Sequence, residues 1–404
     1  MSGDYLPLLI FLIFVAAFLR DDFAFTLVYL IVGVFLLGNW WSRRAIAGIT
    51  YQRKFYNRAF LGEKIKVELE IQNSNWLPVP WLQLRDSLPV QLSGSETFNR
   101  VLSLNPHGQE KFEYILEGRK RGYYPIGPLV VTSGDLMGLG GKDLQIEGPA
   151  EYLTVYPKIV PLASLKFPSR SPLGTLRHMQ PIFEDPTRVK GKRDYVAGDS
   201  LRRVDWKSTA STGRMQIKLF EPSIALETVL FLDLDAQNYY YRSRIDATEL
   251  GIVIAASVAN WVAGKGQTVG LYTNGEDPLA FQSRAQFLPP RRGKGHLMRI
   301  LETLARLHMV DGDSLSLARQ IQNQRVHLPW GTTLIVITGS VDDVLLDELH
   351  QARRAGQNAV IILSGRSVGV VDAQARAGFF GIPVVHLSNE QALEAWGRGR
   401  GIAR

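Results

Sequence analysis

The feature that most constrains this chain is an uncharged apolar run from Phe23 to Trp41. A helix that crosses the hydrocarbon core of a bilayer needs about 20 largely apolar residues, within a range of about 17–25. Trp40 and Trp41 end the run where an aromatic belt would meet the membrane–water interface. The run therefore predicts a membrane-spanning helix.

A second apolar run, Leu6–Leu19, precedes it and is separated from it by three charged residues at 20–22. It reaches a spanning length only when Gly3–Arg20 is counted, with both ends at the interface. A cleaved signal peptide is disfavoured because the start carries Asp4 and no Lys or Arg. A hairpin inside a soluble core is disfavoured because its tip would be charged. We therefore expect residues 1–44 to form a two-helix membrane hairpin.

Basic residues follow the second run closely: Arg43, Arg44, Arg53, Lys54 and Arg58. The loop between the runs carries one Arg and two Asp. Basic residues near the ends of spans stay in the cytoplasm. We therefore expect a cell (inner) membrane crossed twice, with both termini and the soluble part in the cytoplasm.

Composition excludes several classes of function. The net charge is +8, and topology or lipid headgroups account for it more simply than nucleic acid does, because no basic tract with interleaved aromatics occurs. The chain has no cysteine, which excludes disulfides, zinc–thiolate sites and thiol nucleophiles.

Residues 50–157 show a period of two in hydrophobicity. In the segment 64–73 apolar and charged residues alternate, and the segment 110–118 alternates in the same way, with turn residues between such runs. This pattern predicts a β-sandwich of immunoglobulin-like type. We expect residues 158–192, which lack periodicity and are rich in Pro, Ser and Arg, to be an irregular linker.

A dense polar block fills residues 193–222. It predicts a helix over 200–210, capped by Asp199, and then a strand in which Met215, Ile217 and Leu219 lie on one face. Alternating carboxylates and arginines neutralise each other, which suits an ion-paired structural element or a partner-docking site better than acid/base catalysis. The residues singled out are Arg193, Tyr195, Gly198, Asp199, Arg202, Asp205, Trp206, Ala210 and Lys218.

The spacing of these residues resembles the signature of the domain-of-unknown-function 58 family, with Ser211 standing where that family usually has Arg. The stretch Lys120-Arg121-Gly122-Tyr123-Tyr124 resembles a second element of the family. The resemblance implies an N-terminal membrane hairpin, a β-rich segment and a C-terminal domain like the von Willebrand factor type A fold. It also implies a partnership with AAA+ ATPases of MoxR type in assembling or maturing protein complexes.

Strand-like and helix-like segments alternate through residues 223–397. The apolar strand segments are rich in Val and Ile, and the segments between them are amphipathic. Such alternation predicts a doubly wound α/β domain with a parallel sheet. Ligands of such sheets bind at the carboxyl ends of the strands.

The resemblance to a type A fold implies a divalent metal at that edge. The first loop here reads Asp233-Leu234-Asp235-Ala236-Gln237, so two expected serines are replaced, and Thr338-Gly339-Ser340 lacks an expected Asp. Asp233 and Asp235 could hold Mg²⁺ through water, but a loop without metal is favoured because a third acidic ligand is missing. Asp342 and Asp343 are either substitutes or the first turn of a helix.

Two other segments of the chain are rich in basic residues. The stretch Pro289–His296 could cradle phosphate before a helix, but it lacks the spacing of a P-loop, so a solvated loop is favoured. Residues 398–404 are expected to be a basic tail.

No nucleophile–base pair or phosphate loop is evident in the sequence, so we expect no cofactor and a non-enzymatic, membrane-anchored adaptor or scaffold that binds other proteins. Two alternatives remain open. One is a Mg²⁺-dependent hydrolase that uses Asp233 and Asp235, and the other is an envelope protein whose sandwich binds a ligand.

Overall fold

The computed structural model describes residues 11, 14, 22–93, 98–133, 144–163, 184–196, 204–222, 227–280, 286–312, 316–367 and 369–398. The chain divides into two compact units. The first comprises Met1–Lys158 and Leu301–Leu307, and the second comprises Ile159–Ile300 and His308–Arg404. Each is described by itself.

The predicted second span is a helix, α2 (Asp22–Ile46). Its segment Phe25–Ile46 is long and apolar enough to cross a membrane, and only 12% of its most apolar window is buried. Its C-terminal end packs on the β-rich part of the unit, where Trp41 Nε1 donates to the carbonyl of Pro78 at 3.2 Å. Of the predicted first span, only Phe11 and Phe14 are described, and both are helical.

The β-rich part has two layers. One is the antiparallel sheet β1-β3-β6. The other comprises the sheets β2-β10-β7 and β5-β4-β8-β9, with only residues 127–128 between β7 and β8. The elements are β1 (Ile49–Lys54), β2 (Arg58–Phe60), β3 (Lys64–Asn73), β4 (Val79–Asp86), α3 (Val90–Ser93), β5 (Asn99–Leu104), β6 (Gln109–Glu117), β7 (Gly122–Ile126), β8 (Leu129–Ser133), β9 (Leu144–Glu147) and β10 (Glu151–Tyr156).

The predicted period-two alternation is confirmed most clearly in β3, where every second side chain is buried. One face of β3 therefore contributes to both cores of the unit. Leu69 and Ile71 pack with residues of β4 and β8, and Ile65 and Val67 pack with residues of β7 and β10.

A buried ion pair joins the two layers. Arg53 of β1 contacts Asp86 of β4 at 2.7 Å, and neither side chain is exposed. Arg53 also donates to the carbonyl of Ile126 at 3.1 Å, and the Tyr114 hydroxyl donates to Asp86 at 2.6 Å. Burial, with the Asp86 carboxylate beside it, raises the pKa of Tyr114. Burying such a pair is costly, and these further hydrogen bonds offset part of that cost.

The Lys120–Tyr124 element lies at the start of β7. Arg121 Nη1 approaches the carbonyls of Leu304, Ala305 and Leu307 at 2.9–3.0 Å, all in the segment that groups with this unit. The guanidinium therefore satisfies carbonyls at the C-terminus of a helix, where positive charge is favourable.

The second unit contains a hairpin that was not fully predicted. β11 (Glu184–Asp194) pairs antiparallel with β12 (Gln216–Pro222), and the short helix α4 (Trp206–Thr212) lies between them. The expectation that residues 158–192 are irregular is wrong from Glu184 onward, since the hairpin begins there. The predicted helix over 200–210 is wrong at Val204 and Asp205, because Asp205 is the extended cap of α4, which begins at Trp206. Residues 197–203 lie outside the described part.

The predicted α/β domain is confirmed as a six-stranded sheet in the order β15-β14-β13-β16-β17-β18. Five strands are parallel and β15 is antiparallel at one edge. Counted along the chain, the order is 3-2-1-4-5-6, as in doubly wound folds. The strands are β13 (Glu227–Leu232), β14 (Thr268–Thr273), β15 (Gln286–Arg291), β16 (Thr333–Thr338), β17 (Asn358–Ser364) and β18 (Val384–Leu387).

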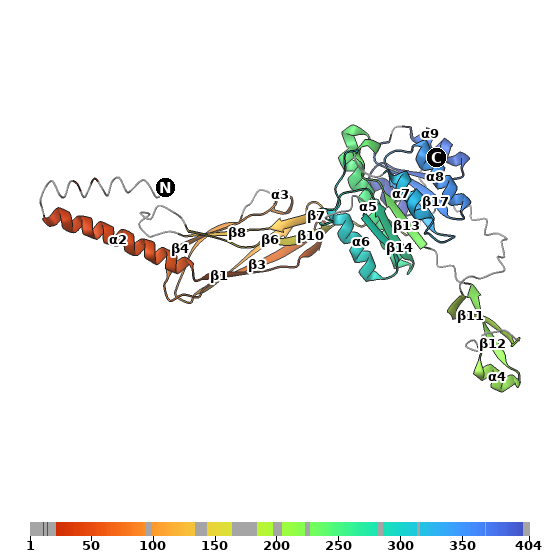
Figure 1. Ribbon diagram of the computed structural model, residues 1–404, viewed down its shortest axis with the longest axis horizontal. Coiled ribbons are helices and arrows are strands. Elements are labelled where there is room, and N and C mark those ends of the chain that lie inside the picture. The colour runs from red at the N-terminus through yellow and green to blue at the C-terminus, as the bar shows by residue number, and fades with distance from the viewer. Residues whose placement is uncertain are drawn as a thin grey trace. The chain divides into compact units, whose positions relative to one another are not determined.

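Helices lie against both faces of this sheet (Figure 1). α7, α8 and α9 pack on the face that carries Val229 and Phe231, while α5 contacts β13, β14, β16 and β17. α5 is also apolar enough to span a membrane, but its window is 72% buried in this core. The helices and turns are η2 (Ala236–Asn238), η3 (Tyr241–Ser243), α5 (Arg244–Gly264), α6 (Lys294–Arg306), α7 (Leu317–Arg325), α8 (Asp343–Arg354), α9 (Val370–Phe379) and α10 (Glu390–Gly397).

The predicted basic loop Pro289–His296 is wrong. Its first residues belong to β15 and its last residues begin α6. His296 Nε2 lies 2.9 Å from the carbonyl oxygen of Val269 and is buried, so this segment is part of the fold rather than a phosphate cradle.

The buried pair of the first unit gives a direct stability prediction. Asp86→Ala leaves the Arg53 guanidinium buried and unpaired, so the free energy of unfolding should fall by about 3–5 kcal/mol. Glu151→Gln is the matched control, because Glu151 is a second carboxylate near Arg53 but is 42% exposed at 3.5 Å. Urea unfolding of the detergent-solubilised chain measures both. Equal effects of the two changes would contradict the assignment.

Candidate functional site

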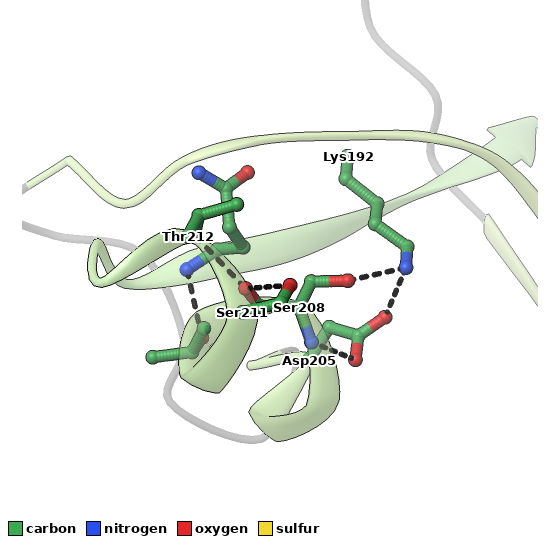
Figure 2. Close-up of polar contacts among 7 residues, drawn as sticks. Lys192, Asp205, Ser208, Ser211 and Thr212 are labelled. Carbon is green, nitrogen blue, oxygen red and sulfur yellow. Dashed lines mark hydrogen bonds and ion pairs between the residues drawn. The ribbon is translucent and has the colours of Figure 1, made fainter.

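The first candidate site is the hairpin–helix unit, defined as β11, α4 and β12. Lys192 of β11 forms an ion pair with Asp205 at 2.9 Å and also donates to the Ser208 hydroxyl (Figure 2). Asp205 accepts from Ser208 N at 3.2 Å, which caps α4 at its N-terminus. Gly213, with φ of 70°, ends the helix in the left-handed conformation.

Backbone bonds hold α4 against the hairpin. Asp205 N donates to the Gln216 carbonyl at 2.8 Å, and Gln216 N donates to the Thr209 hydroxyl at 3.0 Å. The hydrogen bond from Lys192, followed by that from Ser208 N, lowers the pKa of Asp205 to about 2. This carboxylate is therefore ionised at neutral pH and has a structural role as a cap.

The remaining singled-out residues divide into three groups. Tyr195 N donates to the Met215 carbonyl at 2.8 Å, and Arg193 donates to the Asp194 carbonyl at 3.1 Å, so both are held in the hairpin. Lys218 is the cross-strand partner of Lys192, and Ala210 is exposed on α4. Gly198, Asp199 and Arg202 lie outside the described residues.

Trp206 is the large apolar side chain of α4 in the hairpin–helix unit. Its side chain is 68% exposed, and none of the residues of α4 is buried. Among residues 191–196 and 204–219, whose side chains are described, Val204 and Ile217 are the buried apolar ones. The ring of Trp206 is therefore not used to hold the hairpin together.

The second candidate site is the carboxyl edge of the α/β sheet. Asp233 follows β13 and is buried. One carboxylate oxygen accepts from Asn274 Nδ2 at 2.8 Å and from Asp235 N at 3.1 Å. The other accepts from Asn238 Nδ2 at 2.8 Å and from the Thr338 hydroxyl at 2.7 Å. Asn274 follows β14 and Thr338 ends β16, so the carboxylate links the three central strands.

The orientation of Asn274 is fixed, because its Oδ1 accepts from Leu234 N at 2.7 Å and only its amide nitrogen can face Asp233. Tyr239 adds a bond from its hydroxyl to the Asp233 carbonyl at 2.6 Å. Burial raises the pKa of Asp233, and the four donors oppose that shift. The carboxylate thus exchanges water for a full set of protein donors.

These residues do not fit a divalent metal. Both oxygens of Asp233 face N–H and O–H donors, and an amide nitrogen is not a ligand for a hard cation. Asp235 accepts instead from Gln237 N at 3.0 Å and Gly312 N at 3.2 Å. Among the described residues no group of three or more His, Cys, Asp or Glu side chains could hold an ion.

The two other acids considered for this site have structural roles. Asp342 caps α8 through Leu345 N at 2.8 Å, and Asp343 in the first turn pairs with Arg376 at 2.6 Å. The prediction that they form the start of a helix is confirmed.

The sequence-based reasoning missed Asn238, Asn274 and Tyr239. A search for acidic metal ligands does not identify neutral hydrogen-bond donors such as Asn and Tyr. The signal available was an Asn directly after one central strand and a Thr at the end of another, because ends of neighbouring parallel strands meet at one edge.

The structure combines an apolar N-terminal helix long enough to cross a membrane, a β-sandwich and a doubly wound α/β domain. Residues 191–373 match the family described as "Protein of unknown function DUF58", which confirms the resemblance seen in the Arg193–Lys218 block.

Two relatives illustrate the range of similarity. "Uncharacterized protein YeaD" of Bacillus subtilis (strain 168) is 24% identical over 311 residues, which cover 75% of this chain and 72% of that protein. "Uncharacterized protein Rv1480" of Mycobacterium tuberculosis (strain ATCC 25618 / H37Rv) is 31% identical over 114 residues, 28% of this chain and 34% of that protein.

Three solved structures resemble parts of the chain. An aerotolerance-related membrane protein from Bacteroides fragilis NCTC 9343 has a TM-score of 0.32 at 11% identity, covering 43% of this chain and 97% of that one. A von Willebrand factor type A protein from Catenulispora acidiphila has a TM-score of 0.32 at 14% identity, covering 45% and 43%. The CARDB domain of the PF1109 protein from Pyrococcus furiosus has a TM-score of 0.21 at 16% identity, covering 26% and 91%. With these TM-scores they carry no weight for function.

The Asp233 cluster predicts a specific pattern of stability. Asp233→Asn turns one acceptor into a donor that faces another donor, so the free energy of unfolding should fall by about 3 kcal/mol. Asp235→Asn is the matched control, since Asn keeps the accepting oxygen of a cap and should cost less than about 1 kcal/mol. Urea unfolding of the full chain measures both.

The same urea unfolding experiment tests whether a divalent metal binds at Asp233. Millimolar Mg²⁺ or a chelator should leave the unfolding midpoint of the unaltered chain unchanged. A rise of the midpoint with Mg²⁺ that disappears in Asp233→Asn would contradict the structural role of Asp233.

Proposed function

We propose that this protein is a non-enzymatic, membrane-anchored adaptor that works with an AAA+ ATPase of MoxR type in the assembly or maturation of other protein complexes. The observation that carries the proposal is the saturation of Asp233. The acid best placed for chemistry at the carboxyl edge of the sheet already accepts four hydrogen bonds from the protein. The carboxyl edge of the sheet therefore has a structural role, which is what a scaffold requires.

The anchor supports the proposal in a second way. α2 runs into the β-sandwich after only Ala47 and Gly48, so the soluble part is held close to the end of the apolar helix. Arg43 and Arg44 at that end favour a cytoplasmic location. An ATP-driven partner would work in that compartment, because ATP is available there.

The two alternative functions require different arrangements of the protein. A Mg²⁺-dependent hydrolase would need Asp233 and Asp235 to turn toward one ion, which would break at least the bonds from Asn274 and Asn238. An envelope ligand-binding protein would need the sandwich on the opposite side of the membrane. The Mg²⁺ experiment described for the Asp233 cluster tests the first alternative, and the labelling experiment below tests the second.

The partnership is tested by purification from native membranes. The full chain, carrying an affinity tag and solubilised in mild detergent, should recover an AAA+ ATPase of MoxR type in a defined ratio. An unrelated two-span membrane protein with the same tag is the control. Recovery of neither an ATPase nor any stable partner would contradict the adaptor proposal.

The orientation is tested by cysteine labelling, which is clean because the chain has no cysteine. Glu110→Cys and Gln351→Cys, both at exposed positions, should react with a membrane-impermeant maleimide only after the membrane is permeabilised. Asp22→Cys, at the first residue of α2, should react in intact cells. Labelling of Glu110→Cys in intact cells would favour the envelope alternative.

A further inference from the structure

We propose that the hairpin–helix unit is a docking surface for an acidic segment of a partner protein, with Trp206 as its apolar anchor. The inference deepens the proposed adaptor function, since it names the surface and the chemistry of the partner. It does not depend on the partner being an ATPase.

The first step is the exposure of Trp206. A tryptophan that is 68% exposed presents a large apolar surface to water. Met215, directly before β12, is 38% exposed. The bond from Asp205 N to the Gln216 carbonyl places the backbone neighbours of Trp206 and Met215 next to each other. Buried Trp residues are among the strongest anchors of protein interfaces.

The second step is that α4 is held rigidly without the help of Trp206. A helix of seven residues is marginal alone in water. Here Asp205 caps its start, Gly213 ends it, and the Thr209 hydroxyl ties it to Gln216. Lys192 fixes Asp205 in turn (Figure 2). A preorganised element loses less conformational freedom on binding.

The third step is charge. Among residues 191–196 and 204–219, whose side chains are described, basic residues outnumber acidic ones by five to two: Lys192, Arg193, Lys207, Arg214 and Lys218 against Asp194 and Asp205. Lys207, which follows Trp206 in α4, and Arg214, which follows Gly213, are both exposed. Such a concentration complements an acidic partner and would speed encounter with it.

The polar face of α4 favours a protein over a lipid surface. A helix that binds a membrane surface needs a continuous apolar face. α4 has one aromatic residue, and most of its other positions are small and polar: Ser208, Thr209, Ser211 and Thr212. Small polar side chains around a single aromatic ring suit close packing against another protein.

The test is photo-crosslinking in native membranes with the full chain, carrying p-benzoylphenylalanine in place of Trp206. The same group in place of Trp330 or Trp76, each 63% exposed, provides matched controls. The second variable is charge, through a chain that also carries Lys207→Glu and Arg214→Glu. Both positions are exposed, and an unchanged melting temperature shows that this variant folds.

The expected result is a crosslink from position 206 to a protein segment rich in Asp and Glu. Its yield should fall at least about fivefold in the charge-reversed chain, and similarly when salt is raised to about 0.5 M, because screening weakens exposed charge pairs. Crosslinks from positions 330 and 76 should not respond. If the charge-reversed chain does not fold, the salt series decides.

Each other outcome overturns the proposal: no crosslink, crosslinks only within the chain or to lipid, a segment without excess acid, or a yield insensitive to charge and salt. The identity of the captured protein separates the two hypotheses. An acidic partner that is not an ATPase, together with no ATPase recovered in the purification, would retain this docking surface and refute the ATPase partnership. An ATPase recovered in the purification but captured independently of Trp206 would support the ATPase partnership and refute this docking surface.

Discussion

The buried carboxylate of Asp233 is the interaction on which the α/β domain most depends. It lies at the point where β13 meets β14 and β16, and donors from the ends of both neighbours converge on it. The loop that follows β13 folds back through Asn238 and Tyr239 onto the same residue. An unpaired charge at this depth would be costly, so the arrangement holds only while all four donors are in place.

The other two parts of the soluble chain show the same principle. In the β-sandwich, Asp86 is buried between Arg53 and Tyr114 and joins the two layers. In the hairpin–helix unit, Asp205 is fixed by Lys192 and caps α4. In each case a carboxylate that sequence inspection would consider for chemistry stabilises local structure. These carboxylates are therefore not available to other molecules. Trp206 and the basic residues near it are exposed and can contact a partner.

Much of the fold could be predicted because periodicity reports burial directly. The alternation in 64–73 matches β3, and the Val- and Ile-rich segments match the parallel strands. Prediction failed where local chemistry overrides the pattern. β15 contains Pro289 and Pro290, which normally argue against a strand, but it is an edge strand, where prolines are tolerated. α4 begins six residues later than expected because Asp205, rather than Asp199, is its cap.

The candidate sites were predictable only in part. The Arg193–Lys218 block was found because its spacing is dense and specific, but that spacing does not tell whether Trp206 is buried or exposed. The donors around Asp233 come from Asn238, Asn274 and Thr338, which are far apart in sequence and meet only through the strand order. No local pattern in the chain marks them as a group.

The central claim is that protein donors, rather than a cation, hold Asp233. The most direct measurement is a crystal structure of the full chain grown with millimolar Mn²⁺, with anomalous scattering recorded at the manganese edge. The account predicts no anomalous peak at Asp233 and the side chains of Asn238, Asn274 and Thr338 all within hydrogen-bonding distance of its carboxylate. A manganese ion bound to Asp233, with these side chains turned away, would contradict it.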